Sequence, residues 1–301
     1  MPATPFTLVR YALYGVLMGG ADVIPGVSGG TMALIVGIYE RLVRALSAAV
    51  SWGLAVLRLD LDAARRHWAD VPWRLIVPLL GGIAIAILVG ANVIPPLMEA
   101  HPTSMRGLFL GLVAASLLIP ARRIERVTAL RVGLGLACAA GAFLLTGLPA
   151  LAVPDPSLIR VFLSAAVAIC AMILPGVSGA FLLEAMGIYS PTLEALTGLE
   201  WGYVLTFCMG AAIGLGTFAK LLDLLLTHRH DATMAALVGL IAGALRALWP
   251  YGAEARVLRG PEAGEPIVPV VVLALVGFGA VVALLFWSPS AAETTTSPRR
   301  S

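Results

Sequence analysis

The chain has 301 residues, of which 59% are hydrophobic and only 12% are charged, and its mean hydropathy of +0.95 excludes an ordinary soluble domain. Its net charge of +3 gives no basic surface for nucleic acid. The three cysteines lie in apolar runs without CxxC spacing, which argues against a disulfide framework and a metal cluster.

The first half of the chain, residues 1–150, begins with an interrupted apolar region at 8–39. Pro25-Gly26 should end a helix there, because proline lacks an amide donor and glycine allows positive φ. The arm before Pro25 is too short to cross about 30 Å of hydrocarbon, so we expect a re-entrant hairpin of two half-helices. Three transmembrane helices are predicted to follow, near 75–94, 106–121 and 131–150.

The second half, residues 151–288, has the same order of elements. An interrupted region at 158–190 contains Pro175-Gly176, and we expect a second re-entrant hairpin there. A single kinked span is the alternative, above all for the uncharged run at 161–183. Three more transmembrane helices are predicted near 201–226, 232–250 and 266–287, followed by a disordered cytoplasmic tail at 289–301.

The two interrupted regions are copies of each other. Residues 25–29 and 175–179 both read Pro-Gly-Val-Ser-Gly, and 37–39 and 187–189 both read Gly-Ile-Tyr. A second echo lies in the short spans, with Gly107 and Gly111 in one half and Gly239 and Gly243 in the other. Each half thus has one hairpin and three spans. Because three is odd, the second half should be inverted in the bilayer.

The arginines predict the orientation of these halves. One predicted side collects most of them, at 10, 41–74, 122–131, 229 and 299–300, whereas the other side has four, Arg106, Arg160, Arg256 and Arg259. Cytoplasmic loops are enriched in arginine. We therefore expect a multi-pass protein of the bacterial cytoplasmic (inner) membrane with both termini in the cytoplasm.

The repeated motif places a serine where a helix restarts. Serine is a favoured N-cap, and the free amides of a helix start suit an anion. We therefore predict that an anionic substrate binds at the two turns. The alternative is that the serines only cap buried helices. The candidate substrate-binding residues are Ser28, Gly29, Gly30 and Thr31 in the first copy and Ser178 and Gly179 in the second.

Charged residues inside apolar segments are costly and are functional candidates by default. Arg246 could pair with a phosphate, and Asp22 and Glu184 could carry a proton or hold Na⁺ and so couple transport to an ion gradient. Lys220 and Asp223, at i and i+3, are better explained as a pair with each other.

An enzymatic function is not favoured. Residues 26–30 satisfy the G-x-S-x-G pattern of a serine hydrolase, but that pattern needs a preceding strand, and the four histidines lie in loops or at span ends. We predict no catalytic residue, no metal site and no cofactor apart from a coupling ion, H⁺ or Na⁺. A channel or secondary carrier for a small anion remains an alternative to a lipid transporter.

The motifs ADVIPGVSGGTMALIVGIYERL and LPGVSGAFLLEAMGIY, with GLIAGALRALWP, resemble the bacterial polyprenyl-phosphate transporter family over nearly the whole chain. The resemblance implies a flippase that returns undecaprenyl phosphate, the lipid carrier of cell-wall synthesis, from the outer to the cytoplasmic leaflet. Its partners would be this lipid phosphate and the membrane lipids. The chain departs from the family pattern at Glu184 and at Ser190-Pro191.

Overall fold

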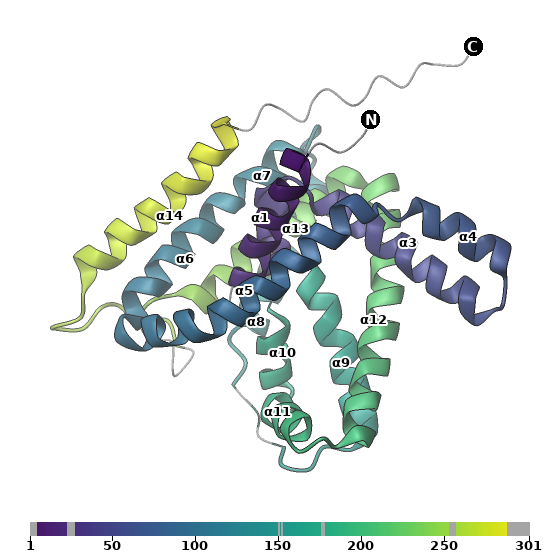
Figure 1. Ribbon diagram of the computed structural model, residues 1–301. Coiled ribbons are helices and arrows are strands. Elements are labelled where there is room, and N and C mark those ends of the chain that lie inside the picture. The colour runs from purple at the N-terminus through teal and green to yellow at the C-terminus, as the bar shows by residue number, and fades with distance from the viewer. Residues whose placement is uncertain are drawn as a thin grey trace.

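A computed structural model describes residues 5–22, 28–149, 151, 153–175, 178–252 and 257–287, and every regular element within these ranges is a helix (Figure 1). The helices of the first half are α1 (Pro5–Asp22), α2 (Gly29–Ile35), α3 (Tyr39–Leu57), α4 (Leu61–Asp70), α5 (Trp73–Ala100), α6 (Pro102–Ser116), α7 (Leu118–Arg122) and α8 (Ala129–Leu145). Those of the second half are α9 (Leu158–Ile173), α10 (Gly179–Ala185), α11 (Tyr189–Thr197), α12 (Trp201–His228), α13 (His230–Ala244), the 3₁₀ helix η1 (Leu245–Leu248) and α14 (Ile267–Trp287).

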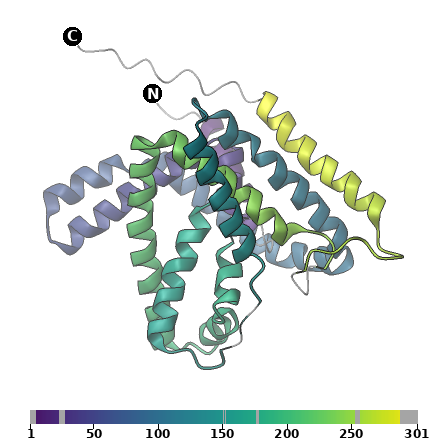
Figure 2. The same ribbon diagram turned by 180° about the vertical axis from the view of Figure 1, so that it is seen from behind.

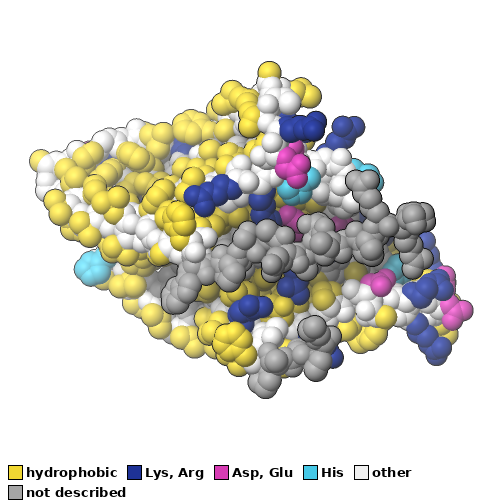
Figure 3. Space-filling view, turned by 90° about the horizontal axis from the view of Figure 1, so that it is seen from above, with side chains coloured by type: hydrophobic (Ala, Val, Ile, Leu, Met, Phe, Trp, Pro, Cys, Tyr) yellow, Lys and Arg dark blue, Asp and Glu magenta, His cyan; other side chains and the backbone are white. Residues whose placement is uncertain are grey.

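Several of these helices can cross a bilayer. Five segments in the described part of the chain are long and apolar enough, namely Trp73–Gly90, Pro102–Arg122, Trp201–His228, His230–Leu248 and Ile267–Phe286. Their outward side chains are largely apolar, and Figure 3 shows one end of the molecule covered almost wholly by hydrophobic side chains while charged ones gather elsewhere. The chain is therefore an all-α, multi-pass membrane protein.

The span predicted at 131–150 is shorter in the structure. Helix α8 has 17 residues and ends at Leu145. The hydroxyl of Thr146 donates to the carbonyl of Ala142 at 2.8 Å, and the chain turns at Gly147 and Leu148. The carbonyl of Ala142 thus accepts from both the amide and the hydroxyl of Thr146, and the apolar sequence continues beyond the end of the helix.

The predicted helix interruptions are present in both halves. Helix α1 ends at Asp22 and α2 begins at Gly29, and α9 ends at Ile173 and α10 begins at Gly179. Both α2 and α10 have seven residues, and both end before a glycine with positive φ, 75° at Gly37 and 76° at Gly187. The copied residues thus adopt the same local structure. Pro25, Gly26 and Gly176 lie outside the described residues.

The long helices pack side by side in four pairs. Within each half, α1 lies along α5 and α9 along α12. The other two pairs join the halves, since α6 lies along α14 and α8 along α13, and the first of these is visible in Figures 1 and 2. A Cβ atom at Gly111 would overlap the carbonyl oxygen of Ala274, and one at Gly243 would overlap that of Ala139. The echoed glycines therefore mark the contacts between the halves.

The arginine-rich segment after the first motif forms a helical hairpin, which the sequence analysis did not predict. Helices α3 and α4 project from the body of the molecule in Figures 1 and 2. The indole rings of Trp52 on α3 and Trp68 on α4 pack together with centroids 5.2 Å apart, and Trp73 at the start of α5 packs on Trp68 with centroids 4.2 Å apart. Asp60 caps α4 by accepting a hydrogen bond from the amide of Ala63 at 2.9 Å.

Candidate functional site

The first motif forms a buried helix start that is capped by two side chains. Ser28 is the N-cap of α2, and its hydroxyl oxygen accepts a hydrogen bond from the amide of Gly30 at 3.1 Å. The amide of Gly29 donates to the carboxylate of Asp22 at 2.7 Å. Ser28 and Thr31 are 3% and 0% exposed. Asp22, a predicted coupling residue, therefore occupies the first free amide of α2.

The second motif has a similar cap with one difference. Ser178 is the N-cap of α10, and its oxygen accepts from the amide of Phe181 at 3.5 Å. Residue 172, which corresponds to Asp22 at the offset of 150, is a methionine. The second helix start therefore lacks the carboxylate that caps the first. The predicted capping role of both serines is confirmed.

The first motif contacts the second interrupted helix directly. The hydroxyl of Ser28 donates to the carbonyl of Met172 at 3.3 Å. A Cβ atom at Gly30 would lie only 2.8 Å from the carbonyl oxygen of Ile173, so this approach requires glycine. Met172 and Ile173 are the last residues of α9 before the second motif. The predicted substrate-binding residues Ser28, Gly29 and Gly30 thus lie at a meeting point of the two interrupted helices.

Arg246 lies where η1 meets the end of α8. Its guanidinium stands over the ring of Phe143, 4.5 Å from the centroid, and Nη1 donates to the carbonyl of the same residue at 3.2 Å. Arg106, at the start of α6, donates from Nη1 to the carbonyl of Ala247 at 3.3 Å. Two arginines therefore flank one short turn. The sequence analysis selected only Arg246, because Arg106 lies at the start of a predicted span and gave no further signal.

Glu184, the second predicted coupling residue, lies near the end of α10 with an exposed side chain. Its backbone carbonyl accepts from the amide of Leu151 at 3.2 Å. Arg160 reaches the same end of α10, where Nη2 donates to the carbonyl of Met186 at 2.7 Å. This arginine neutralises part of the negative end of the short helix.

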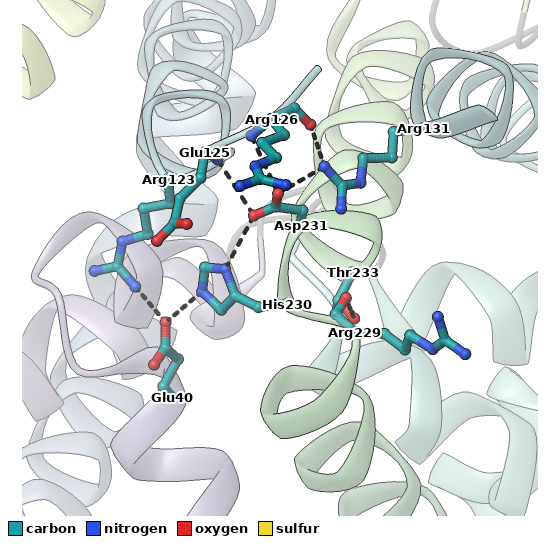
Figure 4. A network of polar contacts seen from close by, with 9 residues as sticks. All are labelled: Glu40, Arg123, Glu125, Arg126, Arg131, Arg229, His230, Asp231 and Thr233. Carbon is teal, nitrogen blue, oxygen red and sulfur yellow. Dashed lines mark hydrogen bonds and ion pairs between the residues drawn. The ribbon is translucent and has the colours of Figure 1, made fainter. Parts of the chain in front are cut away.

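A polar network that the sequence analysis did not predict joins the two halves at the starts of α3, α8 and α13 (Figure 4). The carboxylate of Glu40 contacts Arg123 at 2.7 Å and His230 at 3.5 Å. The carboxylate of Asp231 contacts Arg131 at 2.7 Å and accepts from the amides of Glu125 and Arg126 at 3.2 and 3.1 Å. Three segments of the first half, at Glu40, at 123–126 and at Arg131, are thus joined to the first turn of α13.

The comparisons with known proteins identify transporters that are similar to this chain. The model of the undecaprenyl phosphate translocase-like family matches residues 18–265. The polyprenyl-phosphate transporter of Vibrio cholerae serotype O1 is 38% identical over 240 residues, which cover 79% of this chain and 77% of the relative. The polyprenyl-phosphate transporter of Staphylococcus aureus is 28% identical over 255 residues, covering 79% and 85%. No solved structure matches the chain. The chain belongs to the undecaprenyl phosphate translocase-like family.

Proposed function

We propose that this chain transports undecaprenyl phosphate from the outer to the cytoplasmic leaflet of the bacterial cytoplasmic membrane. The observation that carries the proposal is the meeting of the two interrupted helices, where the Ser28 hydroxyl contacts the Met172 carbonyl at 3.3 Å. Interrupted helices that meet inside a membrane protein are typical of transporter binding sites. Membership of the family and the names of the two relatives specify the lipid phosphate.

The halves are proposed to be inverted in the bilayer, each with one re-entrant hairpin and three spans. The exchange of partners supports this arrangement, because the second span of each half packs on the last span of the other, α6 on α14 and α13 on α8. Such an exchange is expected when two similar units are related by an axis in the membrane plane. With the arginine bias, this arrangement leaves both termini in the cytoplasm.

The phosphate is proposed to bind at the two serine turns, with Ser28, Gly29, Gly30, Thr31, Ser178 and Gly179 as its cradle and Arg246 as a cationic partner. The hydrogen bond from Gly29 to the Asp22 carboxylate is 2.7 Å long. An incoming phosphate and Asp22 would compete for that amide. Loading of Asp22 with H⁺ or Na⁺ would weaken its hold on Gly29, which links ion binding to phosphate binding. Glu184 is the second candidate for this coupling.

Transport then requires the head group to reach each leaflet in turn while the tail stays in lipid. Rocking of two packed units against each other around the serine turns would achieve this. The close helix pairs α6–α14 and α8–α13 join the halves, so each moving unit would contain helices from both.

Replacement of both Ser28 and Ser178 by valine tests the proposal. The change removes two hydroxyls while keeping a similar volume, and hydrogen bonds to a charged group are each worth about 1.5–3 kcal/mol. We expect recycling to fall by about tenfold or more. The measurement is the amount of undecaprenyl phosphate left on the outer leaflet of cells that lack other transporters of this lipid.

Ser164→Val is the matched control, because Ser164 is a buried serine of α9, 5% exposed, outside both motifs. Protein amounts in the membrane are compared for all variants. Normal recycling by the double valine variant at normal protein levels would contradict the binding role of the two turns.

A further inference from the structure

A cavity of about 280 Å³ lies between α8 and α13, one helix from each half. Its lining is apolar apart from one residue, and it includes Arg131, Gly135, Ala139, Val238, Gly239 and Ala242. The family comparison and the serine turns do not account for this cavity. It lies beside the polar network of Figure 4, to which Arg131 also belongs.

The cavity lies in a groove that small side chains leave between two closely packed helices. A Cβ atom at Gly239 would overlap the carbonyl oxygen of Gly135, so the floor of the cavity consists of backbone and small side chains. Larger side chains form its walls, and two of these, Val132 and Leu136, are 47% and 67% exposed. The cavity therefore opens to the outer surface of the helix pair, where we expect it to face hydrocarbon, because α13 belongs to a candidate membrane span and α8 is apolar.

One end of the cavity is lined by an arginine that forms an ion pair. Arg131 stands in the first turn of α8, and its Nη1 contacts the carboxylate of Asp231 at 2.7 Å and the carbonyl of Arg126. A guanidinium has five N–H donors, so these two contacts leave capacity for another acceptor. Arg126 itself is exposed next to this end. An apolar cavity that ends at arginines suits a lipid with an anionic head.

We propose that this cavity is a second site for a polyprenyl phosphate, separate from the serine turns, and that it holds the part of the prenyl tail nearest the head group with the phosphate beside Arg131. The inference rests on the proposed function. Lipid chains gain little by leaving other lipid, so a tail is retained only by close packing. A prenyl chain carries methyl branches and is broad, and the Gly and Ala floor gives it room. The arginine can bind a phosphate monoester with two parallel hydrogen bonds.

Ala139→Leu tests the inference by filling the cavity. Ala139 lies eight positions after Arg131 on α8, which is about 12 Å along the helix. We expect purified protein to bind undecaprenyl phosphate about tenfold more weakly, a loss of about 1.4 kcal/mol. Binding of geranyl phosphate, which has a similar head and a much shorter tail, should stay as in the unchanged protein. Ala140→Leu is the control, because Ala140 is exposed on the same helix and does not line the cavity.

Photocrosslinking of the unchanged protein provides a second measurement that does not depend on a variant folding. An undecaprenyl phosphate analogue with a photoreactive group near its head should label peptides of α8 and α13, and excess phosphatidylglycerol should not prevent the labelling. The inference would be overturned if the Ala139 and Ala140 variants bound the lipid equally, or if phosphatidylglycerol abolished the labelling. In either case, transport by the unchanged protein would still support the proposed function. Absence of any transport by the unchanged protein would instead overturn both.

Discussion

Tyr39, the tyrosine of the first Gly-Ile-Tyr copy, is buried, whereas its counterpart in the second copy is exposed. The side chain of Tyr39 is 1% exposed, and its hydroxyl has no hydrogen-bond partner among the described residues. A buried hydroxyl without a partner costs about 1–3 kcal/mol. We therefore expect Tyr39→Phe to raise the free energy of unfolding by about 1 kcal/mol, measured from the midpoint of thermal unfolding in detergent.

The corresponding residue of the second copy is the natural control. Tyr189 is 40% exposed, so its hydroxyl can be solvated and Tyr189→Phe should leave the unfolding midpoint unchanged. If Tyr39→Phe lowered the midpoint instead, the hydroxyl would have a partner in the folded protein that contributes to stability.

At the scale of helices, glycine determines which elements can pair. Gly111 on α6 and Gly243 on α13 each face the backbone of a helix from the other half, Ala274 on α14 and Ala139 on α8. Gly111→Ala and Gly243→Ala should each destabilise the protein by about 1–3 kcal/mol, because the added methyl group pushes the helices apart. The fraction of protein that stays monodisperse after heating measures the effect.

Gly133 and Gly279 are the matched controls, since a Cβ atom at either position meets no atom within 4 Å. There the same substitution should be neutral or stabilising, because alanine favours a helix more than glycine does. If all four substitutions were neutral or stabilising, helix propensity, and not contact between helices, would control the stability.

At the scale of the whole molecule, the polar network fixes the start of α13 to the first half of the chain (Figure 4). Asp231 has the central position, because its carboxylate contacts Arg131 and the amides of Glu125 and Arg126. Asp231→Asn removes the ion pair and weakens both amide contacts. We expect the midpoint of thermal unfolding to fall and its dependence on salt concentration to decrease.

Asp62→Asn is the comparison for this change, because Asp62 is an exposed aspartate in the first turn of α4. It should change the midpoint much less than Asp231→Asn does, since exposed charges contribute little to stability. Equal effects of the two variants would show that the network does not hold the halves together.

Much of the site was predictable because its signals are local. The Pro-Gly pairs predicted where helices break, and the serines after them predicted the caps that Ser28 and Ser178 make. Spacing cannot predict which helices pack together. The contact from Ser28 to Met172 joins residues 144 positions apart, and Arg106 near Ala247 could not be found from either segment alone.

The sequence by itself determined that this protein is a membrane protein, that its helices are interrupted at two copied motifs, and that a serine caps the helix after each interruption. These properties depend on hydropathy, on missing backbone donors and on side chains a few residues apart. Only the tertiary structure decided that α6 pairs with α14 and α8 with α13, that Glu40 and Asp231 belong to one network, and that a cavity lies beside Arg131. Such features arise from packing between distant segments, where a glycine on one helix lets the backbone of a second helix approach closely.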